Sequence, residues 1–378
     1  MFKIEEKDFS YIDFKKSLLI IKNSRKILVW GDEDADGITA TIILARTLKS
    51  LGKSVEYFIP SRLKDGIGLV EKKVNYFLKK DFDTFITVDC GSVNYEIIKK
   101  IKLSGKNVII TDHHIPYKER IDKVPYINPY FMKSKKFKNL SGSGVSFIFS
   151  IYLLKKFKKV KTYYDAFLFD PLNISLAAVG TKCDKVKVDK TNEQILKYHD
   201  GIFYFIPLIK EFDFDETNIC GIFANSKTIR LKNPMVEFFL NENTKQNFYI
   251  FLKNTKKRIE NFKKKIEKYT QELDKKSYED KKFIIIISDI DYKYVGVLSS
   301  ILSKKYNRPV CVIGKKRKVY SAECRYDGEN FNWLEILKLF EKFFEGYGGH
   351  KKAAGFEIKK EKIDEFVSEF NNRLNSLN

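Results

Sequence analysis

Short apolar runs alternate with longer amphipathic stretches through the first third of the chain. Apolar runs bounded by polar residues predict buried strands, and apolar residues recurring every three or four positions predict helices. Strands are expected at residues 27–30, 55–59, 85–88 and 108–110, and helices at 39–50, 69–80 and 95–103. A helical segment is expected before them, within residues 1–25. This alternation is typical of an α/β fold with a parallel sheet covered on both faces.

The remainder divides into the end of this unit, a connector and a second unit. An apolar run at 174–179 is interpreted as one more strand, and residues 190–245 are expected to be largely helical. Residues 241–278 contain no glycine or proline, and their apolar residues fall on one helix face, which predicts a long connecting helix. That face comprises Leu252, Ile259, Phe262, Ile266, Tyr269 and Leu273.

The alternation of strand and helix resumes at residue 283. Strands are expected at 283–287, 310–313 and 319–322, with a helix at 295–306. The pattern therefore predicts a smaller second α/β domain. The expected boundaries are 1–243 for the first domain, 244–278 for the connecting helix and 279–378 for the second domain.

Acidic and imidazole side chains follow the expected strands of the first domain. These residues are Asp32, Asp34, Asp36, Asp89, His113, His114 and Asp184. In parallel sheets, ligands gather beyond the carboxyl ends of the strands. Like charges this close repel one another, and a bound divalent cation is the usual compensation. The alternatives are a solvated acidic turn and aspartates that cap helices.

Charge and composition narrow the class of partner. The chain has 378 residues, enough for two domains, and a formal net charge of +22. Such an excess favours a polyanionic partner, either nucleic acid or an anionic membrane surface. A coding bias toward lysine, isoleucine, asparagine and phenylalanine is the alternative explanation. The longest candidate apolar run, 147–154, is far shorter than the ~20 residues of a membrane helix.

The five cysteines, Cys90, Cys183, Cys220, Cys311 and Cys324, show no zinc-binding spacing. Their odd number fits no closed disulfide framework, and they are interpreted as reduced thiols. The N-terminus mixes acidic and basic residues and has no signal-peptide core. The expected location is therefore the cytoplasm.

A glycine-rich segment at 346–355 surrounds His350 in the second domain. Glycines let backbone amides approach an anion closely, so this segment is a candidate phosphate-binding turn. A glycine-rich hairpin with an incidental histidine is the alternative.

Taken together, these residues resemble the DHH phosphoesterase superfamily, and within it the RecJ-like single-strand exonucleases. The motifs are Gly-Asp-Glu-Asp-Ala-Asp-Gly (31–37), Val-Asp-Cys-Gly (88–91), Thr-Asp-His-His (111–114), Gly-Thr-Lys-Cys-Asp (180–184) and Gly-Gly-His-Lys-Lys-Ala-Ala-Gly (348–355). Spacers such as Pro-Ser-Arg (60–62) and Leu-Ser-Gly-Ser-Gly-Val (140–145) also fit. The resemblance extends from about residue 20 to 375.

The resemblance implies a DHH domain and a smaller DHH-associated domain that face each other across a cleft. It implies metal ligands at Asp34, Asp36, Asp89, His113 and Asp184. His114 would contact the scissile phosphate, Asp36 would take part in catalysis, and Asp32 would support the site. Substrate contacts are expected at Arg62, Arg230, Arg325, Gly348, Gly349 and His350. Aspartate and histidine ligands suit Mn²⁺ or Mg²⁺, and two ions are expected.

The chain departs from the RecJ pattern at several positions. Ile67 replaces a usual tyrosine, and the motifs around Arg230 and Arg325, which the family links to holding the strand end, are degraded. Trp30 stands where family II pyrophosphatases carry a histidine, which argues against that activity. The sequence ends after the second domain, without the OB-fold of bacterial RecJ, so a minimal or archaeal-type member is expected.

The expected function is metal-dependent exonuclease action on single-stranded DNA in repair, recombination or replication, with 5′-to-3′ polarity favoured. Single-stranded DNA is the expected partner ahead of RNA, together with replication or repair proteins. One alternative is an oligoribonuclease or cyclic dinucleotide phosphodiesterase of the same superfamily. The other is a replication scaffold without a functional metal site.

Overall fold

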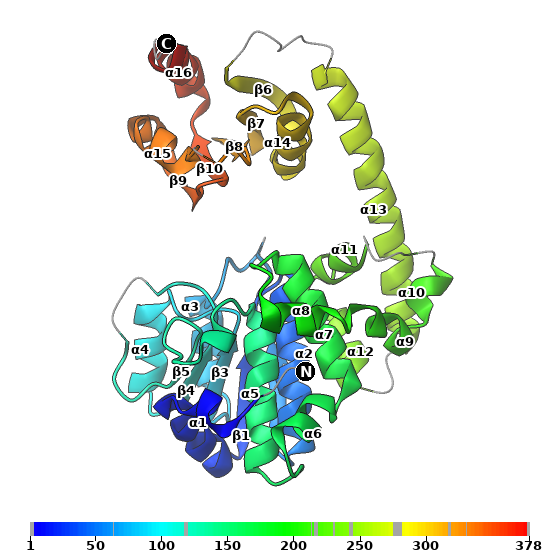
Figure 1. Ribbon diagram of the computed structural model, residues 1–378. Helices are drawn as coiled ribbons and strands as arrows, with labels where there is room; N and C mark the ends of the chain where they lie inside the picture. Colours follow the sequence, from blue (N-terminus) through cyan, green and yellow to red (C-terminus); the bar gives the residue numbers. More distant parts are fainter. Residues whose placement is uncertain are drawn as a thin grey trace. The chain divides into compact units, whose positions relative to one another are not determined.

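The computed structural model describes residues 4–62, 64–116, 120–212, 214, 218–229, 231–241, 245–274, 282–316, 319–329 and 331–375 (Figure 1). The chain forms two compact units, Met1–Lys257 and Arg258–Asn378. The unit boundary falls within the long helix α13 (Lys245–Asp274), at the place where a connecting helix is expected. Among the described helices, none has both the length and the apolar character that crossing a bilayer requires.

The first unit contains a parallel sheet of five strands in the order β2-β1-β3-β4-β5. The strands are β1 (Lys26–Trp30), β2 (Ser54–Phe58), β3 (Thr84–Val88), β4 (Asn107–Thr111) and β5 (Tyr126–Ile127). The strand order reverses between β1 and β3, and in such sheets the ligand crevice lies beyond the carboxyl ends of the strands at this reversal. The α/β fold class and the first four strands are confirmed, whereas the short β5 was not expected.

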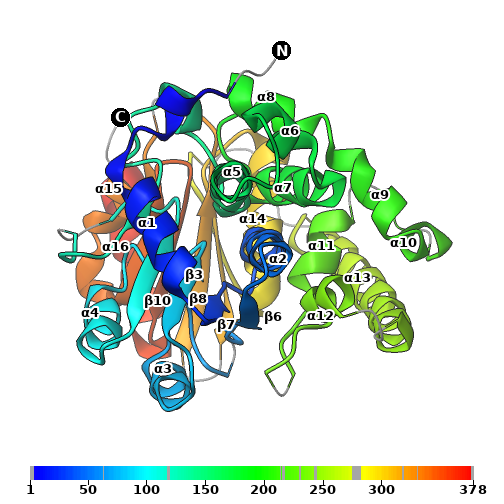
Figure 2. The same cartoon turned by 90° about the horizontal axis from the view of Figure 1, so that it is seen from below.

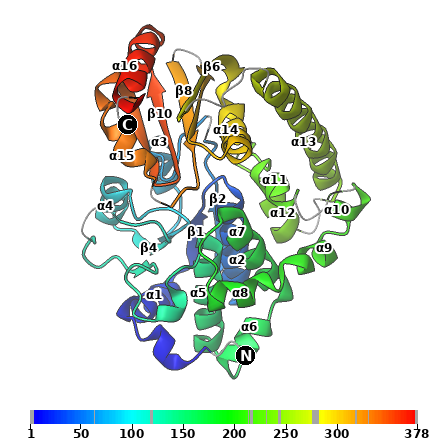
Figure 3. The same ribbon diagram turned by 45° about the horizontal axis from the view of Figure 1, so that its top comes forward.

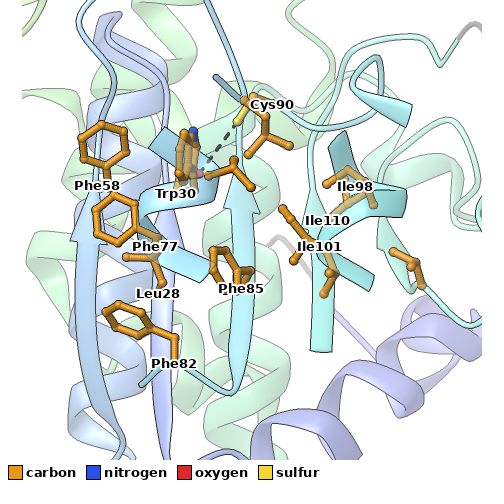
Figure 4. Close-up of a cluster of buried hydrophobic side chains, with 14 of the residues drawn as sticks. Leu28, Trp30, Phe58, Phe77, Phe82, Phe85, Cys90, Ile98, Ile101 and Ile110 are labelled. Carbon is orange, nitrogen blue, oxygen red and sulfur yellow. Dashed lines mark hydrogen bonds between the residues drawn. The ribbon is translucent and has the colours of Figure 1, made fainter. Parts of the chain in front are cut away.

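One face of the sheet is covered by α3 (Glu71–Leu78) and α4 (Tyr95–Leu103). Figure 4 shows their apolar side chains packed against alternate strand residues, with Trp30 and Phe85 among the buried rings. Trp30 also donates a hydrogen bond from Nε1 to the Gly68 carbonyl oxygen at 3.2 Å. The indole therefore joins the end of β1 to the loop that leads into α3.

Three buried helices pack together in the first unit and lie next to one another in Figure 2. They are α2 (Ala35–Ser50), α5 (Gly142–Lys156) and α7 (Pro171–Asp184). The interpretation of 174–179 as a strand is wrong, because these residues lie inside α7. Asp170 caps that helix by accepting the Leu172 N–H, and Pro171 occupies its first turn. An apolar run buried on all sides has no periodicity that separates helix from strand.

Smaller helices complete the first unit. They are η1 (Glu6–Phe9), α1 (Ile12–Asn23), η2 (Lys135–Phe137), α6 (Tyr163–Leu168), α8 (Lys190–Leu196), η3 (His199–Gly201), α9 (Ile202–Phe205), α10 (Leu208–Glu211), α11 (Ile219–Ala224) and α12 (Pro234–Leu240). A disulfide joins Cys183 near the end of α7 to Cys220 in α11. The interpretation of all five cysteines as thiols is therefore wrong for this pair, while Cys90, Cys311 and Cys324 are free and buried.

The second unit contains a mixed sheet in the order β6-β7-β8-β10-β9, in which only β6 and β7 are parallel. The strands are β6 (Ile284–Asp291), β7 (Val310–Lys316), β8 (Val319–Arg325), β9 (Phe344–His350) and β10 (Ala353–Ile358). Figure 3 shows α14 (Tyr292–Tyr306) on one face, with α15 (Trp333–Lys338) and α16 (Ile363–Asn375) on the other. Two short turns, η4 (Glu341–Phe343) and η5 (Lys360–Lys362), complete the unit.

Candidate metal centre

The acidic turn after β1 places its carboxylates by capping a helix. Asp34 is the N-cap of α2, and its Oδ1 accepts the Gly37 N–H at 2.9 Å. Asp36 lies in the first turn and is almost completely buried. Its two oxygens accept the N–H groups of Gly142 (2.6 Å) and Ser143 (3.0 Å), at the start of α5. Two helix N-termini therefore hold this pair of acids, which suits their negative charge.

Asp89 follows β3 and is buried in an unusual backbone conformation. Its φ angle is +57°, in the left-handed region that few residues other than glycine adopt. Its Oδ1 lies 3.2 Å from His113 Nε2, yet it receives no hydrogen bond of acceptable geometry from the described residues. Burial, followed by the charges of Asp36 and Asp34, raises the pKa of Asp89 well above its usual value. Among the described residues, the buried Asp89 Oδ1 therefore has no hydrogen-bond donor, which leaves this oxygen available to bind a cation.

Asp112 organises the two histidines after β4. It is fully buried and accepts the N–H groups of Ser92 (2.8 Å) and His113 (2.7 Å), and His114 Nδ1 at 2.8 Å. Burial would raise the pKa of Asp112, but the hydrogen bond and charge of His114 outweigh it and lower the pKa. The same hydrogen bond raises the pKa of His114 to about 9. Because His114 Nδ1 is engaged, Nε2 is the ring nitrogen left to act on a ligand.

Asp184 reaches the site from the last residue of α7 rather than from a strand end. Its Oδ2 lies 3.7 Å from His113 Nε2. Burial and the charge of Asp36 raise the pKa of Asp184 to about 6, against an opposing contribution from His113. Gly180 makes this approach possible, because a Cβ there would lie 2.5 Å from Asp36 Oδ1.

Three overlapping groups bring all seven acidic and imidazole candidates together. The groups are Asp89 with His113 and His114, Asp36 with His113 and Asp184, and Asp32 with Asp34 and Asp89. Within each group the ligand atoms lie within 4.8 Å of one another. Asp89 and His113 each belong to two groups, so neighbouring cations could share ligands. Carboxylate oxygens and imidazole nitrogens are ligands that suit Mn²⁺, and the acidic members also suit Mg²⁺.

The substrate candidates are placed in different parts of the chain. Arg62 Nη2 lies 2.5 Å from Asp32 and 2.8 Å from Asp34, so its guanidinium is paired with the acidic turn. Arg325 ends β8 and pairs with Glu323 at 2.8 Å. Gly348, Gly349 and His350 end the exposed strand β9, which forms an antiparallel hairpin with β10. Arg230 lies outside the described residues.

Two supporting acids were not assigned from the sequence. Asp112 was quoted within the Thr-Asp-His-His motif without a role. Glu33 is also buried, and its Oε2 accepts the Arg62 N–H at 2.9 Å and lies 3.3 Å from Lys227 Nζ. Lys227 belongs to the segment around Arg230 that the resemblance connects with the strand end. A hydrophilic residue inside an acidic turn carries no sequence signal of burial, so only the structure identifies Glu33.

The fold and the site together define a class of protein. This is a parallel-sheet α/β protein whose acids and histidines meet at the reversal of strand order, in a form suited to divalent cations. Residues 26–172 match the family model described as DHH family, N-terminal domain, and residues 280–376 match the DHHA1 domain. The chain therefore contains a DHH N-terminal domain and a DHHA1 domain.

Individual relatives confirm the RecJ-like resemblance. The single-stranded-DNA-specific exonuclease RecJ of Bacillus subtilis is 27% identical over 93% of this chain. The aligned part covers 46% of that relative, so the chain spans about half of its length. A crystal structure of exonuclease RecJ bound to manganese matches with a TM-score of 0.75 and 24% identity, covering 96% of this chain and 94% of that one. RecJ from Thermus thermophilus in complex with Mn²⁺ matches with a TM-score of 0.77 and 22% identity, covering 97% of this chain and 55% of that one.

Proposed function

We propose that this protein is a metal-dependent exonuclease that hydrolyses phosphodiester bonds in single-stranded DNA. The observation that carries the proposal is the convergence of Asp36, Asp89, His113 and Asp184 in linked ligand groups at the carboxyl edge of the sheet. The named activity of the RecJ relatives supports the substrate. The net charge of +22 supports a polyanionic partner.

In this proposal, Asp34, Asp36, Asp89, His113 and Asp184 hold two Mn²⁺ or Mg²⁺ ions. When bound, the cations supply Lewis-acid polarisation of the phosphate and neutralise the charge that develops on it. Asp112 orients His114 so that its Nε2 can contact the scissile phosphate. Arg62 positions Asp32 and Asp34 through its paired contacts. Asp36 stays fixed because the first turn of α5 binds both of its oxygens.

The second unit supplies further substrate contacts in this proposal, from Arg325, Gly348, Gly349 and His350. The domains are taken as 1–243 and 279–378 with the connecting helix between them. We further propose 5′-to-3′ polarity and a role in DNA repair, recombination or replication, where RecJ-like exonucleases are expected to act. Partner proteins would come from those processes.

The test is digestion of single strands labelled at the 5′ or the 3′ end, as DNA and as RNA, with Mn²⁺, Mg²⁺ or EDTA. We expect release of the 5′ label from DNA first, and no product in EDTA. Asp89→Asn and Asp184→Asn should each lower the rate by about 100-fold or more, because losing a ligand exceeds the 10–100-fold cost of losing a supporting residue. Asp81→Asn is the matched control, because Asp81 is exposed and precedes β3 at the opposite edge of the sheet.

Two results would contradict the proposal. One is digestion by the purified protein that persists in EDTA or in both ligand variants, because the activity would then not depend on the candidate metal centre. The other is cleavage confined to dinucleotides or other very short oligonucleotides, which would assign the protein to the oligoribonuclease alternative. Thermal unfolding of each variant establishes that lost activity reflects the site and not the fold.

A further inference from the structure

A pocket of about 400 Å³ opens beside His113 in the first unit. Its volume lies within the range of sites that hold a small ligand. Two segments line it, the one that carries the histidines and the one from 129 to 138. The residues that matter here are His113, Ile115, Tyr130, Lys133, Lys135 and Lys138. None of the basic or aromatic members was a substrate candidate from the sequence.

The wall of this pocket is fixed to the candidate metal centre. Asn128 is fully buried, and its Nδ2 donates to the His114 carbonyl oxygen at 3.0 Å and contacts Ser92 Oγ at 3.0 Å. Its Oδ1 accepts the Tyr130 N–H at 2.8 Å. One amide side chain therefore couples the backbone of Tyr130 to the segment that carries both histidines. Tyr130 is 63% exposed, although its backbone is held in this way.

The buried Asp8 holds the lysine-rich segment 133–138 against the first unit. Asp8 accepts a hydrogen bond from Ser134 Oγ at 2.9 Å and pairs with Lys136 Nζ at 2.8 Å. Phe137 is buried beneath the segment. Ser134, Lys136 and Phe137 thus anchor the segment to the unit. The neighbouring Lys133, Lys135 and Lys138 remain exposed and line the pocket.

The charge of these three lysines is not compensated locally. Within the described part of the chain, no carboxylate forms an ion pair with Lys133, Lys135 or Lys138, unlike the neighbouring Lys136. Exposed cations in such a row suit successive phosphates of a nucleic-acid backbone, and an exposed ring beside them suits an unstacked base. A base-paired duplex offers no free base face, so the combination favours a single strand.

We propose that this pocket is a binding path for single-stranded DNA that leads to the candidate metal centre. Tyr130 stacks on one base, and Lys133, Lys135 and Lys138 contact the phosphates around it. This inference rests on the proposed function for its substrate class and adds the surface that guides the strand. The side chains of Ile115 and Tyr130 form the apolar part of the path, and His113 marks its catalytic end.

The test measures binding and not cleavage. Fluorescence anisotropy in EDTA follows a labelled oligothymidylate of roughly 20 nucleotides, longer than the 4–16 nucleotides that a typical single-strand site covers. The variant Lys133→Gln/Lys135→Gln/Lys138→Gln should bind more weakly, and its plot of log affinity against log salt should be less steep by about 2. The matched control replaces Lys158, Lys159 and Lys161, three exposed lysines after the far end of α5, with glutamine and should keep the wild-type slope.

A second pair of variants tests the stacking role. Tyr130→Ala should weaken binding about fivefold or more, because stacking on one base contributes roughly that much or more. Tyr130→Phe keeps the ring and should bind like the wild type. The inference is overturned if the wild type does not bind the oligonucleotide, or if both the lysine variant and Tyr130→Ala bind as the wild type does. Binding without cleavage in Mn²⁺ would instead contradict the proposed function and leave this path supported.

Discussion

At the scale of single residues, the candidate metal centre depends on glycines as well as on its ligands, because a side chain at a glycine position would displace a ligand. A Cβ atom on Gly142 would lie 2.6 Å from the Cβ and 2.3 Å from Oδ1 of Asp89. Both distances are shorter than real Cβ contacts, so any side chain at 142 would displace that carboxylate. Asp89 is itself in a left-handed conformation, so its backbone has little freedom to adapt.

Gly142→Ala is therefore expected to weaken Mn²⁺ binding and single-strand cleavage by at least tenfold, which is on the order of the effect of losing a residue that supports a metal ligand. Gly144→Ala is the matched control in the same helical turn, where the three atoms nearest to the added Cβ all belong to the Leu140 side chain, the closest at 3.1 Å. Titration calorimetry with Mn²⁺ measures the difference. Equal affinity in the two variants would show that Asp89 is not held as described.

The ligand residues were accessible to sequence reasoning because each follows a recognisable strand or motif. The supporting residues were not, since their roles depend on burial. The supporting role of Asp112, next to the two histidines that follow it, is shown only by the four hydrogen bonds that its carboxylate accepts. Glu33 resembles any other acid of its turn until its contacts with Arg62 and Lys227 are known.

At the scale of elements, α7 shows why part of the site could not be predicted. Ala177, Ala178 and Gly180 are small and buried, which lets α7 pack closely against α2 and α5. The same composition hides the helical period, so the segment was interpreted as a strand. Asp184 was expected at the same rim because it follows the supposed strand, whereas the structure brings it to within 3.7 Å of His113 from the end of a helix.

The disulfide between α7 and α11 closes a loop across a sequence separation of 37 residues. A cross-link of this span stabilises the folded state by roughly 3–4 kcal/mol in the chain-entropy account. Cys220→Ser should lower the free energy of unfolding by about that amount, measured by urea denaturation without reductant. Dithiothreitol should destabilise the wild type and leave the variant unchanged. A wild type that is insensitive to dithiothreitol would contradict the presence of this bond.

Glu237 ties α12 to the edge strand β2. Its carboxylate accepts hydrogen bonds from Tyr57 Oη at 2.7 Å and Asn241 Nδ2 at 2.6 Å, and it pairs with Lys232 at 3.1 Å. Burial would raise the pKa of Glu237, but these partners outweigh it and hold the pKa below its ordinary value of 4.5. The resulting stabilisation is fully present above that pH and is lost as the pH falls through the lower pKa of the folded state.

Glu237→Gln should therefore lower the free energy of unfolding at neutral pH by roughly 1.5–3 kcal/mol, a typical value for hydrogen bonds to a charged group. The difference from the wild type should shrink as the pH falls below 4.5, where the wild-type carboxyl becomes protonated. Urea denaturation across this pH range measures it. A difference that stays constant with pH would indicate lost packing and not lost charge.

At the scale of the whole molecule, the order of elements was predictable because each sheet combines strong apolar runs with regular helices. The strands β1 to β4 and the helix α4 lie where periodicity places them. The short β5 and the small helices between 190 and 240 have too few residues for a period to emerge. The pocket beside His113 could not be predicted from the sequence either, because it lies between two segments whose proximity depends on Asn128.

The central claim is that distant segments of the first unit bring their carboxylates and imidazoles together around divalent cations. Equilibrium dialysis against Mn²⁺, followed by mass spectrometry of the bound metal, tests it most directly. The wild type is expected to retain about two ions per chain. The Asp89→Asn/Asp184→Asn variant is expected to retain fewer than one ion, at an unchanged melting temperature in EDTA. Equal manganese in the two proteins, or none in the wild type, would contradict the account.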